Sequence, residues 1–303
     1  MSAAHSIPIT IADTLIDLAS PLSADELGIT QRLGPFFGRP DNPLAHVALR
    51  WQESIEPPIP SGDVIYDAGV VWRMHRATVP GVGEVYEAAL HHQSDSRSAL
   101  VKAVLRANPS WDDLTLTERR SGPSWGSLLA ISAGELILRA AIVLTGGLMF
   151  HASGLDDNGQ GVLFLGHSGA GKSTQAGLWR QEPGVLVMNE DRMAVRADEQ
   201  GARCYGTPWG GTAGHVLNHA APLAGIVVIE QGPENGIEPI LPAAAASLLT
   251  ARAYLPYWDP ALMRRALGNV NAMLSKVPVY RLRCRPEPAV IPLVRSLYRT
   301  PAP

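Results

Sequence analysis

The sequence predicts an α/β protein with a β-rich N-terminal domain over residues 1–125 and a second domain over residues 126–303, in which helices accompany a mixed sheet. Two observations predict this class. The first 120 residues contain short runs with strand-like alternation, separated by turn-rich stretches. From about residue 125 helical periodicity appears, and a strand, a glycine-rich loop and a helix then follow one another. The division near residue 125 follows from this change of pattern.

Length and composition indicate a folded protein of one large or two smaller domains. Of 303 residues, 46% are hydrophobic and 17% are charged, which is enough apolar material for a core. The formal net charge of −3 predicts no nucleic-acid partner, because such a partner requires a basic surface. Cys204 and Cys284 are too few for a disulfide scaffold or a four-cysteine zinc site, and we expect both to be buried. The N-terminus lacks the basic start and apolar run of a signal peptide, which favours a cytoplasmic protein.

The N-terminal region contains several candidate strands. β-Branched or alternating runs predict strands at Ile7–Ile11, His46–Trp51, Val70–His75 and Val82–Leu90. The segment Ala99–Arg106 is either a strand or a short helix, since its periodicity does not separate the two. The pair His91 and His92 has no further metal ligand at a telling spacing, so a solvated strand end is the favoured interpretation.

An apolar segment, Leu128–Phe150, is nearly long enough to span a bilayer. Glu135 and Arg139 lie in its middle at the spacing of a helical ion pair, and charges at mid-membrane are costly. We therefore expect a core helix over Ser127–Leu144, ended by Gly146, that runs into a strand. No membrane partner is predicted.

The rest of the second domain alternates between strands and helices. Strands are predicted at Leu148–Ser153, Gly161–Leu165, Val185–Met188, Ala224–Glu230 and Val279–Cys284. Helices are predicted at Lys172–Arg180, Pro242–Ala253, Pro260–Ser275 and Ala289–Tyr298. The glycines of residues 206–215 predict a flexible lid around Trp209. His215 and His219 have the spacing of two metal ligands on one helix face, but no third ligand is placed.

A phosphate-binding motif lies between a predicted strand and a predicted helix. Residues 166–173 read Gly-His-Ser-Gly-Ala-Gly-Lys-Ser and fit the P-loop pattern G-x-x-x-x-G-K-[ST] in full. The glycines allow the backbone N–H groups to surround phosphate, Lys172 reaches the β- and γ-phosphates, and the Ser173 hydroxyl binds Mg²⁺. The candidate nucleotide-binding residues are Gly166, His167, Ser168, Gly169, Ala170, Gly171, Lys172, Ser173 and Thr174.

Two adjacent acids, Glu190 and Asp191, follow the strand Val185–Met188. Ligands of open α/β sheets bind at the carboxyl ends of strands, so this pair is expected to face the phosphates. One carboxylate can hold Mg²⁺ and the other can accept the proton of an attacking hydroxyl. The short interval from the P-loop favours a kinase over motor and transporter ATPases. A solvated strand end that carries two acids by chance is the alternative.

These residues resemble the catalytic core of the HPr kinase/phosphorylase group, which is related to phosphoenolpyruvate carboxykinase. The group has a histidine on the strand before the P-loop, and His151 stands at a matching interval. The group also has two adjacent acids followed by an arginine, which correspond here to Glu190, Asp191 and Arg192. The resemblance covers mainly residues 146–196. It implies that Glu190 is the general base, Asp191 a Mg²⁺ ligand and His151 a polar support beside them, with Lys172 completing the catalytic set.

Other segments are similar to HPr-kinase homologues from bacterial peptide-biosynthesis clusters, including lasso-peptide kinases. They are Tyr205–Gly211, Pro222–Gln231, Pro256–Asp259 and Val277–Leu282. The chain departs from HPr kinase itself in four ways. Glu190 replaces an aspartate, and the P-loop ends Lys-Ser-Thr rather than Lys-Ser-Glu. No stretch matches the HPr-binding signature, and residues 1–125 do not match the N-terminal domain of HPr kinase. These departures argue against HPr as the acceptor and against reverse phosphorolysis.

The sequence thus predicts a kinase that uses ATP or another nucleoside triphosphate with Mg²⁺ and transfers the γ-phosphate to a hydroxyl, most readily Ser or Thr of a peptide or protein. A small-molecule kinase and a non-catalytic nucleotide-binding module are the alternatives. Arg252 and Arg281 are candidates to stabilise the transferred phosphate, although either can equally be a surface ion pair. A homo-oligomeric state is compatible with the sequence.

Overall fold

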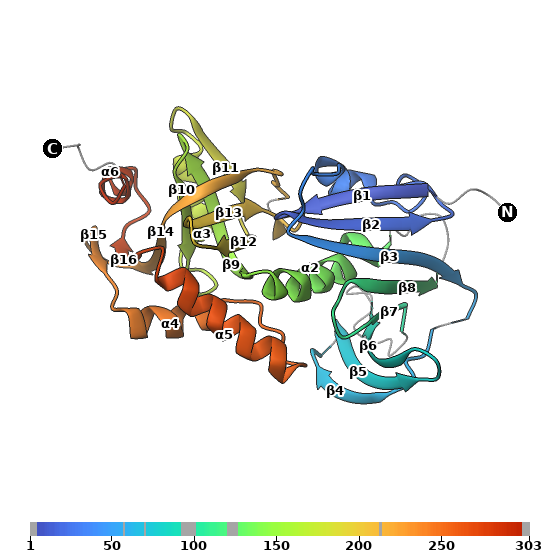
Figure 1. Ribbon diagram of the computed structural model, residues 1–303. Coiled ribbons are helices and arrows are strands. Elements are labelled where there is room, and N and C mark those ends of the chain that lie inside the picture. Colours follow the sequence, from blue (N-terminus) through green and yellow to red (C-terminus); the bar gives the residue numbers. More distant parts are fainter. Residues whose placement is uncertain are drawn as a thin grey trace. The chain divides into compact units, whose positions relative to one another are not determined.

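The computed structural model describes residues 5–56, 58–69, 71–91, 101–119, 127–211 and 214–298. The chain divides into two compact units, each of which contains one large sheet (Figure 1). Unit 1 comprises Met1–Ala141 with Pro256–Pro260, and unit 2 comprises Ile142–Leu255 with Ala261–Pro303. The mixture of helices with two strand-rich sheets confirms an α/β protein. That residues 1–125 form a domain of their own stays a prediction.

The sheet of unit 1 has eight strands, in the order β1-β2-β3-β8-β7-β6-β5-β4. Strands β2, β3 and β8 run parallel to one another, and all other neighbours are antiparallel. The bounds are His5–Ile11 (β1), Thr14–Ser20 (β2), Ala45–Ser54 (β3), Asp63–Asp67 (β4), Trp72–Val79 (β5), Gly83–Leu90 (β6), Ala103–Ala107 (β7) and Asp113–Arg119 (β8). The helices α1 (Thr30–Leu33) and η1 (Gly34–Phe36) lie between β2 and β3 in the sequence.

The β-rich character predicted for the N-terminal region is confirmed, with additions. The segment at Ala99–Arg106, open between strand and helix, overlaps strand β7 from Ala103 onward. The first two residues of this segment and His92 lie outside the described residues. Strands β2, β4 and β8 were not predicted. Most side chains of β2 are buried on both faces, so its sequence lacks the alternation that marks a half-buried strand.

An aromatic cluster explains why Pro256–Pro260 belongs to unit 1. The Trp258 ring lies 5.6 Å from that of Trp72 and 5.7 Å from that of Trp111, centroid to centroid. The Arg139 guanidinium lies 5.1 Å from the Trp258 ring centre. The Tyr86 hydroxyl donates a hydrogen bond of 2.7 Å to Asp259, the residue that follows Trp258. Aromatic and cation–π contacts of this kind stabilise a core beyond the area they bury.

A single helix was predicted over Ser127–Leu144, and this is wrong in one respect: the helix is interrupted at Ile131. A 3₁₀ turn, η2 (Leu128–Ala130), is followed at Ile131 by non-helical dihedral angles, and α2 then runs over Ser132–Leu144. The Ser127 hydroxyl caps η2 by accepting a hydrogen bond from the Leu129 amide. No helix in the described part of the chain is long and apolar enough to cross a membrane.

The sheet of unit 2 is mixed, as predicted. Its strands are β9 (Gly147–Asp157), β10 (Gly161–Leu165), β11 (Val185–Asn189), β12 (Arg192–Ala197), β13 (Ala202–Gly206), β14 (Ala220–Gln231), β15 (Gly236–Pro239) and β16 (Val279–Cys284). The sheet order is β10-β9-β12-β13-β14-β16-β15, β11 pairs with β9, and β10 also pairs with β14. Strands β10, β14 and β16 are parallel, and the remaining pairs are antiparallel.

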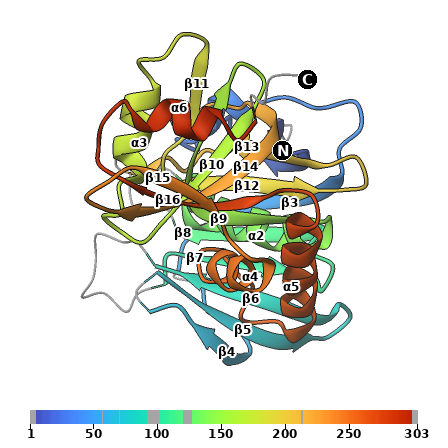
Figure 2. The ribbon, with the colours of Figure 1, turned by 90° about the vertical axis from the view of Figure 1, so that its left-hand side faces the viewer.

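Helices cover this sheet on both sides. They are α3 (Lys172–Trp179), α4 (Pro242–Thr250), α5 (Pro260–Leu274) and α6 (Val290–Arg295). Figure 2 shows α3 and α6 on one side of β16, and α4 and α5 on the other. Alternate residues of β10, β14 and β16 pack with Trp179 of α3 and Val290 of α6 in one hydrophobic core. The packing holds the loop between β10 and α3 at the carboxyl end of β10.

A buried carboxylate, Asp157, fastens α6 to the end of β9. It accepts hydrogen bonds of 2.9 and 3.0 Å from the Arg295 guanidinium, of 2.9 Å from the Tyr298 hydroxyl and of 2.8 Å from the Asn158 amide. Burial alone raises the pKa of Asp157, but these hydrogen bonds and the Arg295 charge outweigh it and hold the pKa below its ordinary value.

We expect Asp157→Asn to lower the free energy of unfolding by about 3 kcal/mol, because it leaves the Arg295 charge without this partner. In the wild type, the stabilisation is present above the ordinary pKa and is lost as pH falls through the lowered pKa of the folded state. Urea unfolding followed from pH 7 to pH 3 measures both effects. The exposed Glu199→Gln serves as control, and equal stability of the two variants at pH 7 would contradict the assignment.

Candidate active site

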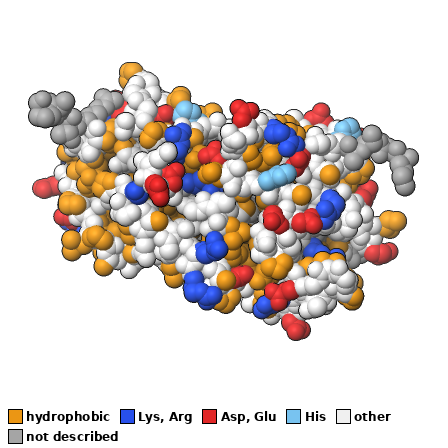
Figure 3. Space-filling view, viewed as in Figure 1, with side chains coloured by type: hydrophobic (Ala, Val, Ile, Leu, Met, Phe, Trp, Pro, Cys, Tyr) orange, Lys and Arg blue, Asp and Glu red, His pale blue; other side chains and the backbone are white. Residues whose placement is uncertain are grey.

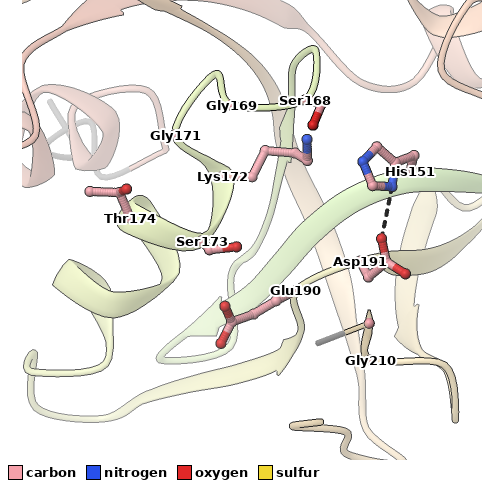
Figure 4. Close-up of a pocket in the computed structure, with 11 residues that line it drawn as sticks. His151, Ser168, Gly169, Gly171, Lys172, Ser173, Thr174, Glu190, Asp191 and Gly210 are labelled. Atoms are coloured by element: carbon pink, nitrogen blue, oxygen red, sulfur yellow. Dashed lines mark ion pairs between the residues drawn. The ribbon is translucent and has the colours of Figure 1, made fainter. Parts of the chain in front are cut away.

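A cleft of about 340 Å³ in unit 2 brings together the functional residues predicted on three separate segments, and Gly210 and Gly211 join them from a fourth. Figure 4 shows them around the loop between β10 and α3. The lining residues are His151, Ser168, Gly169, Gly171, Lys172, Ser173, Thr174, Glu190, Asp191, Gly210 and Gly211. Of the predicted loop residues, Gly166, His167 and Ala170 do not line it. All the residues predicted to be catalytic or to bind Mg²⁺ do.

The backbone of the glycine-rich loop needs its glycines. Gly169 has a φ of +79° and Gly171 a φ of +111°, in the region that residues with a Cβ atom rarely adopt. At Gly166, a Cβ atom would lie 2.7 Å from the Cβ of Ala170. The Gln231 side chain, at the end of β14, donates a hydrogen bond of 2.9 Å to the Gly169 carbonyl and supports the loop. The conformation is that of a compact loop leading directly into the N-terminus of α3.

Lys172 lies over the loop that precedes it. Its Nζ donates hydrogen bonds of 3.2 Å to the carbonyls of Gly166 and His167, and the residue is 7% exposed. Burial lowers the pKa of Lys172, the positive charge of Arg252 lowers it further, and Asp191 acts in the opposite direction. Repulsion between these two positive charges favours an anion as ligand, because an anion relieves it.

Strand-like pairing with β9 positions Arg252. The His151 amide donates a hydrogen bond of 2.9 Å to the Arg252 carbonyl, and the Tyr254 amide donates one of 2.8 Å to the Met149 carbonyl. The second candidate arginine, Arg281, instead forms ion pairs with two glutamates of the sheet. The structure therefore separates the two: Arg252 acts electrostatically on the loop lysine, and Arg281 belongs to a surface ion-pair group.

The two adjacent acids point apart (Figure 4). An Asp191 oxygen lies 2.9 Å from His151 Nδ1, and its other oxygen lies 3.2 Å from the Arg192 guanidinium. An oxygen of Glu190 lies 2.5 Å from the guanidinium of Arg180, the residue after α3. Consecutive side chains thus have separate partners: His151 and Arg192 orient Asp191, whereas Arg180 holds Glu190.

The surroundings of Asp191 stabilise its negatively charged form. Burial raises its pKa, but the His151 hydrogen bond and the positive charges of Arg192, His151 and Lys172 have the larger combined effect and lower it. Asp191 is consequently a carboxylate at neutral pH. Together with the Ser173 hydroxyl, it supplies the hard oxygen ligands that Mg²⁺ prefers, and Mg²⁺ usually keeps several waters and takes few protein ligands.

The sequence did not predict the residues that support the acids. Asn189 is fully buried, and its side-chain oxygen accepts hydrogen bonds from the Asp191 and Arg192 amides. Its side-chain nitrogen donates to the carbonyls of Thr207 and Trp209. One buried amide thus ties the turn after β11 to the segment that follows β13. An asparagine directly before two acids is the signal that was available.

The described part of the glycine-rich segment after β13 contributes to the wall of the cleft. Trp209 is 1% exposed and so is packed in the interior rather than presented to a ligand. Gly211 has a φ of +59°, and a Cβ atom there would lie 2.9 Å from the Cβ of Asp191. Gly210 and Gly211 therefore line the cleft, and the absence of a side chain at Gly211 leaves room for Asp191. Residues 212 and 213 of the predicted lid lie outside the described residues, and the lid stays a prediction.

The interpretation of His215 and His219 as metal ligands on one helix is wrong, because no helix forms there. His215 Nε2 is 2.7 Å from the Val187 carbonyl, and His219 Nε2 is 2.8 Å from an oxygen of Asp156. Within the described ranges, no three His, Cys, Asp or Glu side chains are grouped to hold a metal ion. Both cysteines are buried free thiols, as predicted.

Comparison with known proteins gives a partial match. No family model matches the chain. Two relatives are each 31% identical to this chain over 119 residues. Both are named HPr kinase/phosphorylase, one from Limosilactobacillus reuteri strain DSM 20016 and one from Limosilactobacillus reuteri subspecies reuteri strain JCM 1112. The match covers 39% of this chain and 34% of the relative. Part of the chain is thus similar to HPr kinase/phosphorylase. The chain matches about a third of the length of these relatives.

Proposed function

We propose that the cleft binds ATP with Mg²⁺ and transfers the γ-phosphate to a hydroxyl group. One observation carries this proposal: the glycine-rich loop and Lys172 meet His151, Glu190 and Asp191 in one cleft, although these residues lie on three separate segments. The partial similarity to a kinase supports the same reaction class. Phosphoryl transfer depends mainly on positioning and on stabilising charge, and this site offers both.

In this proposal the loop and two cations hold the phosphates. The backbone N–H groups of residues 166–173 and the positive end of α3 favour an anion. Lys172 exchanges its two carbonyl partners for phosphate oxygens, and Arg252 adds a second positive charge where charge develops in the transition state.

The acids have different roles because they point in different directions. Asp191, oriented by His151, holds Mg²⁺ together with Ser173. The ion neutralises charge on the phosphates when it is bound. Glu190 accepts the proton of the attacking hydroxyl, and Arg180 fixes the position of its carboxylate before the acceptor arrives. His151 therefore acts on the metal side of the site, as a positioning residue.

The acceptor proposed is Ser or Thr of a peptide or protein. The relatives are named for a kinase whose substrate is the protein HPr, which supports a polypeptide acceptor for this chain as well. Unit 1 adds a surface that suits an extended peptide. Strand β4 ends its sheet, pairs with β5 alone among the described residues, and exposes Val64 and Ile65. Cytoplasmic location belongs to the same proposal.

A library experiment tests the acceptor. Intact protein is incubated with ATP, Mg²⁺ and either a Ser/Thr peptide library or a panel of hydroxylated metabolites, and products are identified by mass spectrometry. We expect mass increases of one phosphoryl group in peptides, and none with the Lys172→Ala variant. Efficient phosphorylation of a metabolite with no modified peptide would establish the small-molecule kinase instead. Nucleotide binding without any transfer or hydrolysis would establish a non-catalytic module.

A further inference from the structure

A buried amide stands directly before the two acids of the cleft. Asn189, the last residue of β11, is fully buried, and the oxygen and the nitrogen of its side chain have two hydrogen-bond partners each. A carboxamide has two donor hydrogens and two acceptor sites, so its whole hydrogen-bonding capacity is used. A buried polar network that is complete in this way holds a single arrangement of the groups it joins.

The oxygen of this amide fixes the backbone of Asp191. Asn189 Oδ1 accepts hydrogen bonds of 2.8 Å from the Asp191 amide and of 2.9 Å from the Arg192 amide. The Asp191 carbonyl, in turn, accepts a hydrogen bond of 3.0 Å from the Ala152 amide of β9. The peptide groups on both sides of the Asp191 Cα atom are thereby held. Its side chain is directed toward His151, which precedes Ala152 on β9.

The nitrogen of the same amide holds the wall of the cleft beside Asp191. Nδ2 donates hydrogen bonds of 2.8 Å to the Thr207 carbonyl and of 3.3 Å to the Trp209 carbonyl. The next two residues, Gly210 and Gly211, line the cleft. A Cβ atom at Gly211 would lie 2.9 Å from the Cβ of Asp191, so the wall and the acid leave no room between them for a methyl group. One side chain thus fixes both the acid and the backbone packed against it.

Local hydrogen bonds, rather than the charge of the protein surface, are suited to direct the two acids. On the face viewed in Figure 3, Lys and Arg side chains are interspersed with Asp and Glu, and exposed charges farther apart than the Debye length are largely screened. Glu190 and Asp191 are consecutive, yet their side chains point apart and have different partners. Such a divergence requires a fixed backbone between the two residues, and the Asn189 amide supplies it.

We propose that Asn189 is a positioning residue for phosphoryl transfer, whose amide orients Asp191 toward Mg²⁺ and holds Gly210 and Gly211 beside it. This inference rests on the proposed function, in which Asp191 holds the ion. Asn189 is buried behind the acids and is not among the residues that line the cleft, so it acts through Asp191 rather than on a ligand. Residues that orient a metal ligand typically contribute about 10- to 100-fold to metal affinity, although they do not touch the metal.

Binding of Mn²⁺ tests this role without relying on activity. Mn²⁺ stands in for Mg²⁺, since both prefer oxygen ligands, and its electron paramagnetic resonance signal reports the free ion. Intact protein is saturated with an ATP analogue whose γ-phosphate cannot be transferred. We expect Asn189→Ala to weaken Mn²⁺ binding about 10- to 100-fold and to change the affinity for the metal-free analogue by less than about twofold. Asn189→Ser should lose less, because its hydroxyl can still accept a hydrogen bond from the amide two residues on.

Asn269 of α5 provides a matched control. Its side-chain nitrogen also donates to two backbone carbonyls, those of Val143 and Gly147 at 2.9 and 3.0 Å, and it does not line the cleft. Asn269→Ala should lower the midpoint of thermal unfolding, as Asn189→Ala does, and leave Mn²⁺ binding unchanged. A double variant tests the route of the effect. If Asn189 acts through Asp191, Asn189→Ala with Asp191→Asn should bind Mn²⁺ no more weakly than Asp191→Asn alone.

The Mn²⁺ titrations separate the role of Asn189 from the function on which it depends. Equal Mn²⁺ affinity of wild type and Asn189→Ala, or equal weakening in Asn189→Ala and Asn269→Ala, would overturn the positioning role while the metal site stands. Additive losses in the double variant would overturn it as well, because Asn189 would then act independently of Asp191. Should Asn189→Ala fail to fold, Asn189→Ser gives the same comparisons. If the wild type takes up no Mn²⁺ with the analogue, or Lys172→Ala binds the analogue as tightly as wild type, the proposed function itself fails.

Discussion

Lys172→Ala is expected to abolish phosphoryl transfer and to weaken nucleotide binding by two orders of magnitude or more, as the phosphates lose a charged hydrogen-bond donor. The fold should survive. The amino group donates hydrogen bonds to two carbonyls of its own loop, and its removal creates no uncompensated charge in the core. Calorimetric titration of MgATP together with a transfer assay measures both effects.

A matched lysine variant controls for the loss of charge. The Nζ of Lys276 also donates a hydrogen bond to a backbone carbonyl, that of Glu199, but it lies outside the cleft. Lys276→Ala should therefore keep both affinity and rate. Unchanged ATP affinity in Lys172→Ala would remove the basis for assigning the glycine-rich loop to phosphate binding.

Glu190→Gln is expected to lower the transfer rate by about 10²–10⁴-fold and to leave nucleotide affinity and the Mg²⁺ requirement unchanged. Asp191→Asn should instead raise the Mg²⁺ concentration needed for half-maximal rate, because the ion loses an anionic ligand. The two effects are separable because the carboxylates point apart and have different partners, Arg180 and His151. Rates measured over a Mg²⁺ series give both quantities.

The control for the two acid variants is Glu199→Gln, an exposed change outside the cleft. Should Glu190→Gln retain full turnover while Asp191→Asn eliminates it at saturating Mg²⁺, the assigned roles are reversed. In that case the His151–Asp191 pair, which is 2.9 Å apart, is the proton acceptor.

The elements around the motif were predictable because local rules determine them. A strand at Gly161–Leu165 and a helix beginning at Lys172 occur as expected, since an apolar run, a loop with left-handed glycines and an amphipathic segment each leave a local signal. Strands β12 and β13 were not predicted. They form a hairpin buried between β9 and β14, and nearly continuous burial removes the alternation that identifies a strand.

The candidate site shows the same limit. The loop, the acids and His151 carry chemistry that can be read from residue type and spacing. The partners of these residues could not be predicted, because Arg180 meets Glu190 only through the turn between α3 and β11. Likewise, Arg252 and Arg281 are equivalent in the sequence. The backbone pairing of residues 252–254 with β9 places Arg252 where its charge lowers the pKa of Lys172, and this long-range pairing has no local signal in the sequence.

The fate of the γ-phosphate tests the central claim most directly. Phosphorus NMR of intact protein with ATP, Mg²⁺ and the Ser/Thr peptide library follows every phosphorus species at once. The account predicts loss of the ATP γ-resonance, growth of ADP and a new phosphomonoester resonance, all of which depend on Lys172 and Mg²⁺. An ATP spectrum that stays unchanged under these conditions, or ATP that yields only inorganic phosphate and ADP with every acceptor, would contradict it.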